Sequence, residues 1–297
     1  MKRLVRIAAA LAVLGTSIGP ALAAETLYAT SLRSHGNTAS FIAGSLYTVD
    51  PATGAATVIG PIRVGETAIG IVAVASHPKT GVFYGITAGL SPTIALSLVT
   101  IDLATGNATV VARLGAAGSD IGFAPDGTLF MWLPDTNQVA RVDLSTGATT
   151  PLGPSGIQGI VGGGITITAA GDAALVAATG ATGTLDSVDL NTGVARIGPM
   201  LTGAPYPSSI DNLTTSPTGE LYAVNSNGGA PSNAVLVKID TATGVITKIG
   251  ALPDDTHGLI FAPRAESALS PTDMKKWVLV ILALVALALI GFAVFMK

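Results

Sequence analysis

The sequence predicts an all-β domain of five repeats with four strands each, and three observations lead to this prediction. One short phrase, Asp-x-x-Thr-Gly, recurs five times in the middle of the chain, at intervals of 41 to 52 residues. Runs rich in β-branched residues flank every copy, and a further pair of such runs lies between copies. Periods of this length are typical of propellers and other repeat arrays. We therefore expect a β-propeller with five four-stranded blades.

The composition is that of a folded domain with little charge. The chain has 297 residues and no cysteine, and its 49% hydrophobic and 11% charged residues argue against disorder. Residues 25–264 contain 16 acidic and nine basic side chains. Because no basic stripe runs through this range, nucleic acid is not expected as a partner.

The first 23 residues have the three parts of a secretory signal peptide. Lys2 and Arg3 form a basic start, residues 7–18 are an apolar stretch, and residues 21–23 (Ala-Leu-Ala) are a small-x-small cleavage site. An N-terminal membrane helix is the alternative, but the apolar stretch is short and is interrupted at residues 15–17. We therefore expect the chain to be exported.

The recurring phrase is explained by the chemistry of a hairpin turn. Asp accepts hydrogen bonds from backbone N–H groups two or three residues later, and Gly supplies the positive φ that closes such a hairpin. The alternative is a set of five metal loops. It is disfavoured because each loop has one carboxylate, whereas calcium takes roughly six to eight oxygen ligands. The expected structural turn residues are Asp50 and Gly54, Asp102 and Gly106, Asp143 and Gly147, Asp189 and Gly193, and Asp240 and Gly244.

A second pair of strands is expected between successive hairpins. One strand leads into a Pro/Gly turn, as in the Phe-Ala-Pro-Asp-Gly run of residues 123–127, and the next begins just after it with a Leu-Tyr or Leu-Phe pair. The ends complete the pattern, because residues 26–28 match a second strand and residues 258–263 match a first strand. A C-terminal strand should therefore close the ring and remove the exposed sheet edges. An open β-solenoid is the alternative.

Three motifs of the repeat point to a family. The x-Leu-Tyr, Val/Ile-Asp-x-x-Thr-Gly and Phe-Ala-Pro-Asp-Gly patterns together resemble bacterial secreted β-propeller-repeat proteins, and they cover nearly all of residues 25–264. This resemblance implies a propeller over residues 24–264. It implies no particular activity, because one fold hosts many functions.

The C-terminal tail predicts a membrane anchor. Residues 277–296 carry no charge and are long enough to cross about 30 Å of hydrocarbon as a helix. Residues 265–276 would then be a polar linker. With an export signal at the other end, we expect the propeller on the periplasmic or extracellular side of the membrane. The alternatives are a buried core helix and a tail-anchored protein facing the cytoplasm, which would leave residues 1–23 unexplained.

The same tail loosely resembles bacterial membrane-anchor sorting tails. Pro271 and Thr272 precede the apolar span, as in such tails, but only Lys297 follows it where those tails usually end in an Arg-rich cluster. The departure from the pattern favours simple anchoring.

Several polar residues precede or begin the expected innermost strands, which should place them at one mouth of the central channel. Oxygen ligands that converge from different blades can hold a calcium ion, as in some six-bladed hydrolase-like propellers, an analogy at the level of the fold. A solvated rim of hydrogen-bonded groups is the alternative, and the sequence favours it. The candidate ligand-binding residues are Glu66, Asp120, Asp211, Asn212, Asp255 and His257.

The functional expectation is a binding module. No catalytic motif withstands inspection: a Gly-x-Ser-x-Gly match lies in the signal peptide, and the three histidines lack zinc spacing. We therefore expect a membrane-tethered, non-catalytic module at the cell envelope, with an envelope protein or glycan as partner and no required cofactor. The rival hypotheses are a calcium-dependent hydrolase or lyase at the channel mouth and a small-ligand sensor.

Overall fold

The computed structural model describes residues 25–33, 43–89, 91, 94–158, 163–178, 183–206, 209–229 and 232–263. The expected signal peptide (1–23), linker (265–276) and membrane helix (277–296) lie outside the described residues. Within the described ranges, no helix has the length and hydropathy that crossing a membrane requires.

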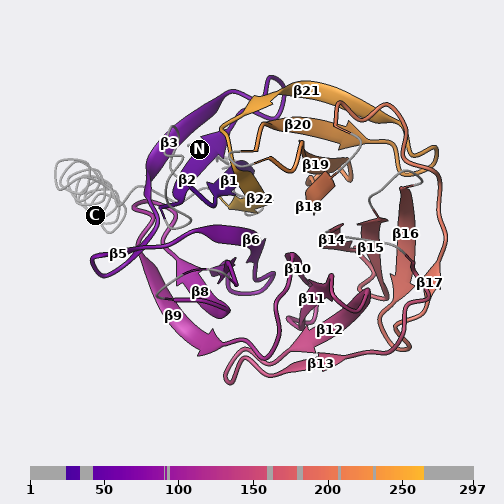
Figure 1. Cartoon of the computed structure of the whole chain (residues 1–297), viewed down its shortest axis with the longest axis horizontal. Coiled ribbons are helices and arrows are strands. Elements are labelled where there is room, and N and C mark those ends of the chain that lie inside the picture. The colour runs from indigo at the N-terminus through magenta and orange to yellow at the C-terminus, as the bar shows by residue number, and fades with distance from the viewer. Residues whose placement is uncertain are drawn as a thin grey trace, which may run out of the picture.

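Five four-stranded antiparallel sheets surround a central channel like the blades of a propeller (Figure 1). From the innermost strand outward, blade 1 contains β22 (Thr256–Pro263), β1 (Glu25–Ser31), β2 (Ser45–Val49) and β3 (Ala56–Pro61). Blade 2 contains β6 (Ile71–Ser76), β7 (Phe83–Thr87), β8 (Ser97–Ile101) and β9 (Ala108–Arg113). Blade 3 contains β10 (Asp120–Phe123), β11 (Leu129–Leu133), β12 (Gln138–Val142) and β13 (Thr149–Pro151). Blade 4 contains β14 (Gly163–Ile167), β15 (Ala173–Ala178), β16 (Thr184–Asp189) and β17 (Ala195–Arg196), and blade 5 contains β18 (Ser209–Thr215), β19 (Leu221–Ser226), β20 (Ala234–Ile239) and β21 (Ile246–Leu252).

Blade 1 closes the ring. Its innermost strand β22 comes from the C-terminal end of the described chain and pairs with β1, in a register that runs from Glu25 opposite Pro263 to Ser31 opposite Thr256. The predicted five blades and the closing C-terminal strand are both confirmed. The innermost strands begin at one face of the ring, called the upper face below, and end at the lower face (Figure 1). β1 therefore begins, and β22 ends, at the lower face.

The hydrophobic core is divided into five clusters, one between each pair of neighbouring blades. Successive side chains of a strand point to opposite faces of its sheet, so each blade packs against both neighbours. Trp132 of blade 3, which is fully buried, shares a cluster with Ile165 and Val176 of blade 4. Truncating a buried side chain of this size typically costs about 3–5 kcal/mol. Stability therefore depends on the contacts between blades, and hence on closure.

The five Asp-x-x-Thr-Gly turns have the geometry that the sequence predicts. In each, the Gly N–H donates to the Asp carbonyl oxygen over 2.8 Å, with the Gly φ between 72° and 79°. Asp143 is typical: its Oδ1 accepts N–H groups from Ser145 and Thr146 at 2.8 and 2.9 Å. A hydrogen bond from the Ser145 hydroxyl, followed by those from Thr146 and the Ser145 N–H, lowers the pKa of Asp143 to about 2.

The turn glycines also make a contact that the sequence does not reveal. All five are buried against the end of the outermost strand of the preceding blade or the residues just after it. A Cβ atom on Gly147 would lie 2.0 Å from the carbonyl oxygen of Arg113, and one on Gly244 would lie 2.2 Å from that of Met200. Glycine is thus required both for the positive φ and for the approach of one blade to the next.

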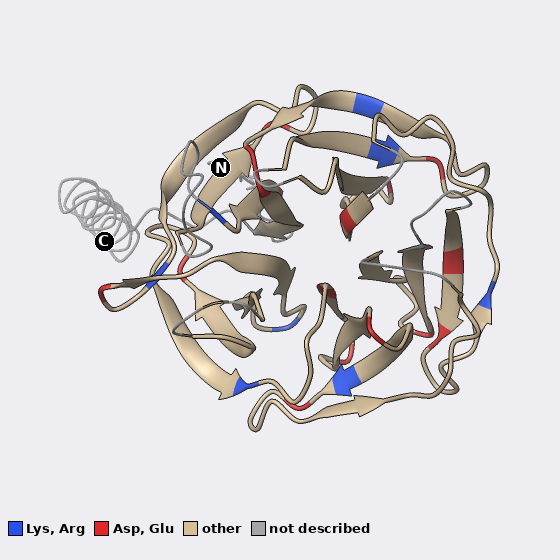
Figure 2. Cartoon of the chain, in the orientation of Figure 1, with Lys and Arg blue, Asp and Glu red and all other residues tan. Residues whose placement is uncertain are grey.

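The outer edges of the blades are protected against pairing with other chains. Pro61 and Pro151 lie on the outermost strands β3 and β13, where each removes a backbone donor. Arg113 and Lys248 lie on β9 and β21, and Figure 2 shows Lys and Arg residues in blue at intervals along the outer strands. Proline and charge at exposed edges disfavour edge-to-edge association.

A small hairpin interrupts the repeat between blades 1 and 2. β4 (Arg63–Val64) pairs with β5 (Thr67–Ala68), and the hairpin projects from the outer side of the ring (Figure 1). Its turn contains the exposed Glu66.

Candidate functional site at the central channel

Asp120 links three blades from inside the ring. It is the first residue of β10, and its side chain is fully buried. Oδ2 accepts the backbone N–H groups of Ile165 in blade 4, at 2.8 Å, and of Leu213 in blade 5, at 3.1 Å. Oδ1 accepts the N–H of Ile121 at 2.9 Å and the Asn212 side-chain amide at 2.6 Å. One carboxylate thus satisfies N–H groups that would otherwise face the channel unpaired.

A glycine allows this arrangement. Gly164 directly precedes Ile165 on β14, and a Cβ atom there would lie 2.6 Å from the carbonyl carbon of Asn212 and 2.7 Å from the nitrogen of Leu213. Without a side chain at Gly164, the inner strands of blades 4 and 5 approach closely enough for Asp120 to reach both. The sequence contains no local signal for this contact, because the three segments are far apart in the chain.

Burial raises the pKa of Asp120 well above its ordinary value, and the four N–H donors oppose that rise. The four donors nevertheless determine which interactions the Asp120 side chain makes. Every partner is an N–H group, so the side chain acts as an acceptor that holds the inner strands together.

Asp255 is also used within the fold. It is buried, adopts a positive φ of 55°, and accepts hydrogen bonds through Oδ1 from Arg33 Nη1 at 2.8 Å and from the Ser232 N–H at 2.9 Å. Its own N–H donates to the carbonyl oxygen of Ser232 at 2.9 Å. The residue therefore joins the entry to β22 with the loop before β20 and the end of β1. A buried charge that is paired in this way is structural, and removing either partner would leave the other uncompensated.

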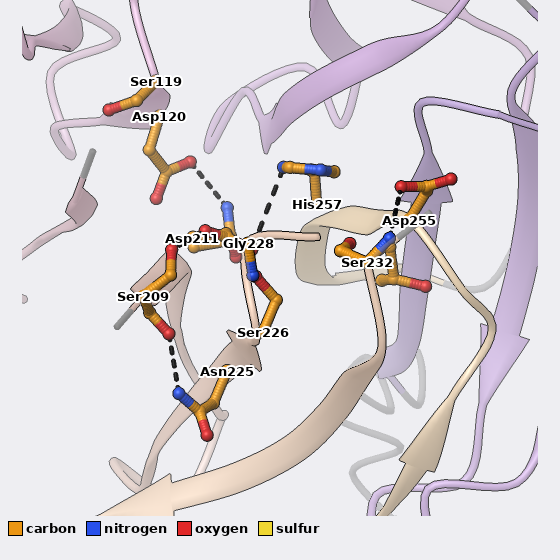
Figure 3. A network of polar contacts seen from close by, with 12 residues as sticks. Ser119, Asp120, Ser209, Asp211, Asn225, Ser226, Gly228, Ser232, Asp255 and His257 are labelled. Atoms are coloured by element: carbon orange, nitrogen blue, oxygen red, sulfur yellow. Dashed lines mark hydrogen bonds and ion pairs between the residues drawn. The ribbon is translucent and has the colours of Figure 1, made fainter. Parts of the chain in front are cut away.

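Asp211 and His257 lie side by side at the upper channel mouth. They come from the neighbouring inner strands β18 and β22, and Asp211 Oδ2 is 3.9 Å from His257 Nδ1 (Figure 3). Their side chains are 12% and 24% exposed, so a part of each faces the channel mouth. Ser209 donates its hydroxyl to Asp211 Oδ1. Asp211 Oδ2 is buried and has no hydrogen-bond partner among the described residues.

The structure thus brings four of the six predicted residues together. Asp120 and Asn212 are joined by a hydrogen bond, and Asp211 and His257 form a second pair next to Asn212. Asp255 instead faces the surrounding loops, and Glu66 lies on the β4–β5 hairpin outside the ring.

This geometry suits the recognition of a hydrogen-bond donor. In the described part of the chain, no group of three or more His, Asp or Glu residues is placed to hold a metal ion. The N–H groups around Asp120 present their positive ends to the carboxylate, which leaves it no free lone pairs for a cation. Ser209, Asp211 and His257 do not form a catalytic triad either, because the serine donates to the aspartate, whereas a triad places histidine between the two.

A cavity at the lower channel mouth was not predicted from the sequence. It has a volume of about 500 Å³, and a chamber of about 160 Å³ extends from it into the channel. Ser76, Ile167 and Thr215 line both spaces. These residues end the inner strands of blades 2, 4 and 5, just before the turns to the second strands. These three residues occupy equivalent positions when the repeats are aligned, so an alignment of the repeats would have predicted that they lie together.

Comparison with known proteins defines the fold. No protein-family model and no curated protein sequence matches this chain. A chain in the crystal structure of the nidogen/laminin complex matches 80% of this chain and 98% of its own length, with 11% identity and a TM-score of 0.51. The crystal structure of TolB from Acinetobacter baumannii matches 80% of this chain and 67% of its own length, with 17% identity and a TM-score of 0.47. The first likeness agrees with the β-propeller arrangement of the five sheets, and the chain has the fold of a β-propeller repeat protein.

Proposed function

We propose that this chain is an exported, membrane-tethered β-propeller that binds a partner at its upper face and has no catalytic role. The proposal rests on the hydrogen bonds that the acidic residues near the upper mouth make or lack. Asp120 and Asp255 are occupied by donors of the fold itself, whereas Asp211 keeps a buried oxygen without a hydrogen-bond partner among the described residues. A rigid scaffold that presents such a group at a loop-bearing face is a typical binding site.

The direction of the tether supports the choice of face. β22 ends at Pro263 on the lower face, and the sequence places the apolar run 13 residues beyond, from residue 277. An extended linker of that length spans about 45 Å at most. A tether that leaves from the lower face would turn that face toward the bilayer. The upper face would then point away from the membrane, toward an envelope protein or glycan.

The partner chemistry follows from the unsatisfied acceptor. A buried polar atom without a hydrogen bond costs about 1–3 kcal/mol, and a partner that supplies the missing donor recovers that free energy on binding. A sugar hydroxyl and a Lys or Arg side chain are both donors of this kind. His257, 3.9 Å from Asp211, would contact the same group from blade 1.

Site-specific photo-crosslinking in a bacterial host tests the proposal on the full chain. One variant carries the photoreactive residue at Thr136, an exposed position on the upper β11–β12 connection, and a second carries it at Thr218, an exposed position in a lower turn. We expect a discrete envelope component to crosslink from the first position and not from the second. Asp211→Asn should abolish that adduct, because it replaces an acceptor with a donor, and Glu66→Gln should leave it unchanged.

Equal adducts from both faces, or an upper-face adduct that survives Asp211→Asn, would contradict the proposed site. A calcium-dependent hydrolase was the rival hypothesis. It gains no support from the described residues, among which no group of three or more His, Asp or Glu residues is placed to hold a metal ion.

A further inference from the structure

Two adjoining cavities lie in the lower half of the central channel. The outer cavity and the inner chamber are continuous through Ser76, Ile167 and Thr215, which line both. At the upper end, the chamber is lined by Ile165 and Leu213, the two residues whose N–H groups bond to Asp120 Oδ2. The network around Asp120 therefore borders the chamber on its upper side, and the outer cavity borders it on its lower side.

The walls of the chamber are apolar and polar in equal measure. Ile121, Phe123, Ile165 and Ile260 are among the lining residues, and the hydroxyl-bearing Thr166 lies beside them. The outer cavity, with a volume of about 500 Å³, has the size of a site for a small molecule, and the chamber adds to it.

One carboxylate lies at the mouth, and the described residues that line the two cavities include no counter-charge to it. Glu25 begins β1 and lines the outer cavity, and no Lys or Arg is among the described residues that line either space. Its carboxylate has no hydrogen-bond or ion-pair partner in the described part of the chain, and burial raises its pKa. His77 lines the same cavity, but its Nδ1 already accepts the N–H groups of Lys79 and Thr80, at 3.2 and 3.3 Å.

We propose that this cavity is a binding site for a small amphipathic amine. Its apolar body occupies the chamber beside Ile167 and Phe123, and its protonated nitrogen lies at Glu25, where it donates a charge-assisted hydrogen bond to a carboxylate that has no such partner among the described residues. The site is on the face opposite Asp211 and stands independently of the partner-binding function proposed above.

Three probes that share one ring and differ in charge test the proposal. Benzylamine, benzyl alcohol and benzoate are titrated against the full chain in lipid nanodiscs by isothermal calorimetry, with empty nanodiscs as the blank for partitioning. We expect benzylamine to bind saturably at one site and about tenfold or more tighter than benzyl alcohol, since an unpaired carboxylate gains a charged partner. Benzoate should not bind.

Two variants and one control separate the charge from the cavity. Glu25→Gln should lower the affinity for benzylamine to that for benzyl alcohol, and Ile167→Trp should weaken both by filling the chamber. Glu66→Gln, an exposed acid outside the ring, should change neither. The melting temperature of each variant confirms that the ring is folded. The proposal is overturned if benzylamine shows no saturable binding above the blank, if the three probes bind alike, or if Glu25→Gln binds benzylamine as the wild type does.

Discussion

Replacing Asp120 with Asn tests whether one carboxylate holds the inner strands together. The substitution keeps the shape of the side chain but turns one acceptor oxygen into an N–H₂ group. Each oxygen of Asp120 accepts two N–H groups, so the variant leaves at least two buried donors facing another donor. An unsatisfied buried donor costs about 1–3 kcal/mol, which gives a gross loss of about 2–6 kcal/mol. Relief from burying a charge offsets part of this loss.

We therefore expect a net destabilisation of about 2 kcal/mol or more, measured by urea unfolding of the full chain in detergent. For a domain of this size it corresponds to a fall in melting temperature of roughly 4 °C or more. Asp126→Asn is the matched control, because Asp126 is exposed in a turn of the same blade and accepts the Thr128 N–H at 2.8 Å. A variant at Asp120 that melts at or above the wild-type temperature would refute the reasoning.

The pH dependence of the same variant gives an independent check. Burial raises the folded-state pKa of Asp120 above its unfolded value, so the folded protein holds this proton more tightly. The contribution of Asp120 to stability is then largest at low pH and decreases as pH rises through the raised pKa. The difference in melting temperature between wild type and Asp120→Asn should therefore shrink as the pH rises from the ordinary Asp pKa of 3.8 through the raised pKa. A difference that grows over this range would contradict the assigned direction.

The remaining predictions concern the turns, the closure and the topology. Gly147→Ala should destabilise the protein more than Gly81→Ala. Both glycines have a positive φ, but of the two only Gly147 would bring a Cβ atom against a backbone oxygen of the preceding blade. Equal losses of stability would mean that this contact between blades is unimportant. Acidification from pH 5 toward pH 2 should lower the stability of the ring. The pKa of Asp143 is depressed to about 2 in the folded state, so its contribution to stability is present above the ordinary Asp pKa and is lost as the pH falls through about 2. Asp143→Asn should make the stability less dependent on pH over this range. Deleting residues 256–263 should prevent folding, as blade 1 then lacks its inner strand, and a cooperative melt of the shortened chain would argue against closure. As the chain has no native cysteine, Thr136→Cys should react with a membrane-impermeant maleimide on intact spheroplasts, and labelling only after lysis would place the propeller in the cytoplasm.

The blade architecture could be predicted because its signals are local. An Asp and a Gly four residues later, as in Asp143 and Gly147, form a turn through bonds within a few residues, and repetition at propeller spacing then indicates the ring. The match between residues 258–263 and a first strand was enough to predict closure. The contact of Gly147 with Arg113 could not be predicted, since it depends on how one blade meets the next.

The channel residues show where sequence reasoning reached its limit. Asp120, Asp211 and His257 all occur near the start of an inner strand in the sequence, and the structure brings them near one another as this predicts. It could not reveal that N–H groups from three blades would saturate Asp120, because those groups belong to the backbone of distant segments. Glu66 lies in the connection between blades 1 and 2, and its place before an innermost strand in the sequence predicts a position at the channel mouth. In the structure that connection folds into a separate hairpin.

The most direct test measures the metal content of the purified full chain and its melting temperature with and without a chelator. It decides whether the acidic residues of the channel stabilise the fold and bind a partner or instead bind a metal ion. A ligand bound to the folded state raises the melting temperature by mass action, so its removal is visible in the melt. The account predicts no stoichiometric calcium and an unchanged melting temperature in chelator, with Asp120→Asn still destabilised. One bound calcium ion per chain and a chelator-sensitive melt, both lost in Asp120→Asn, would contradict it.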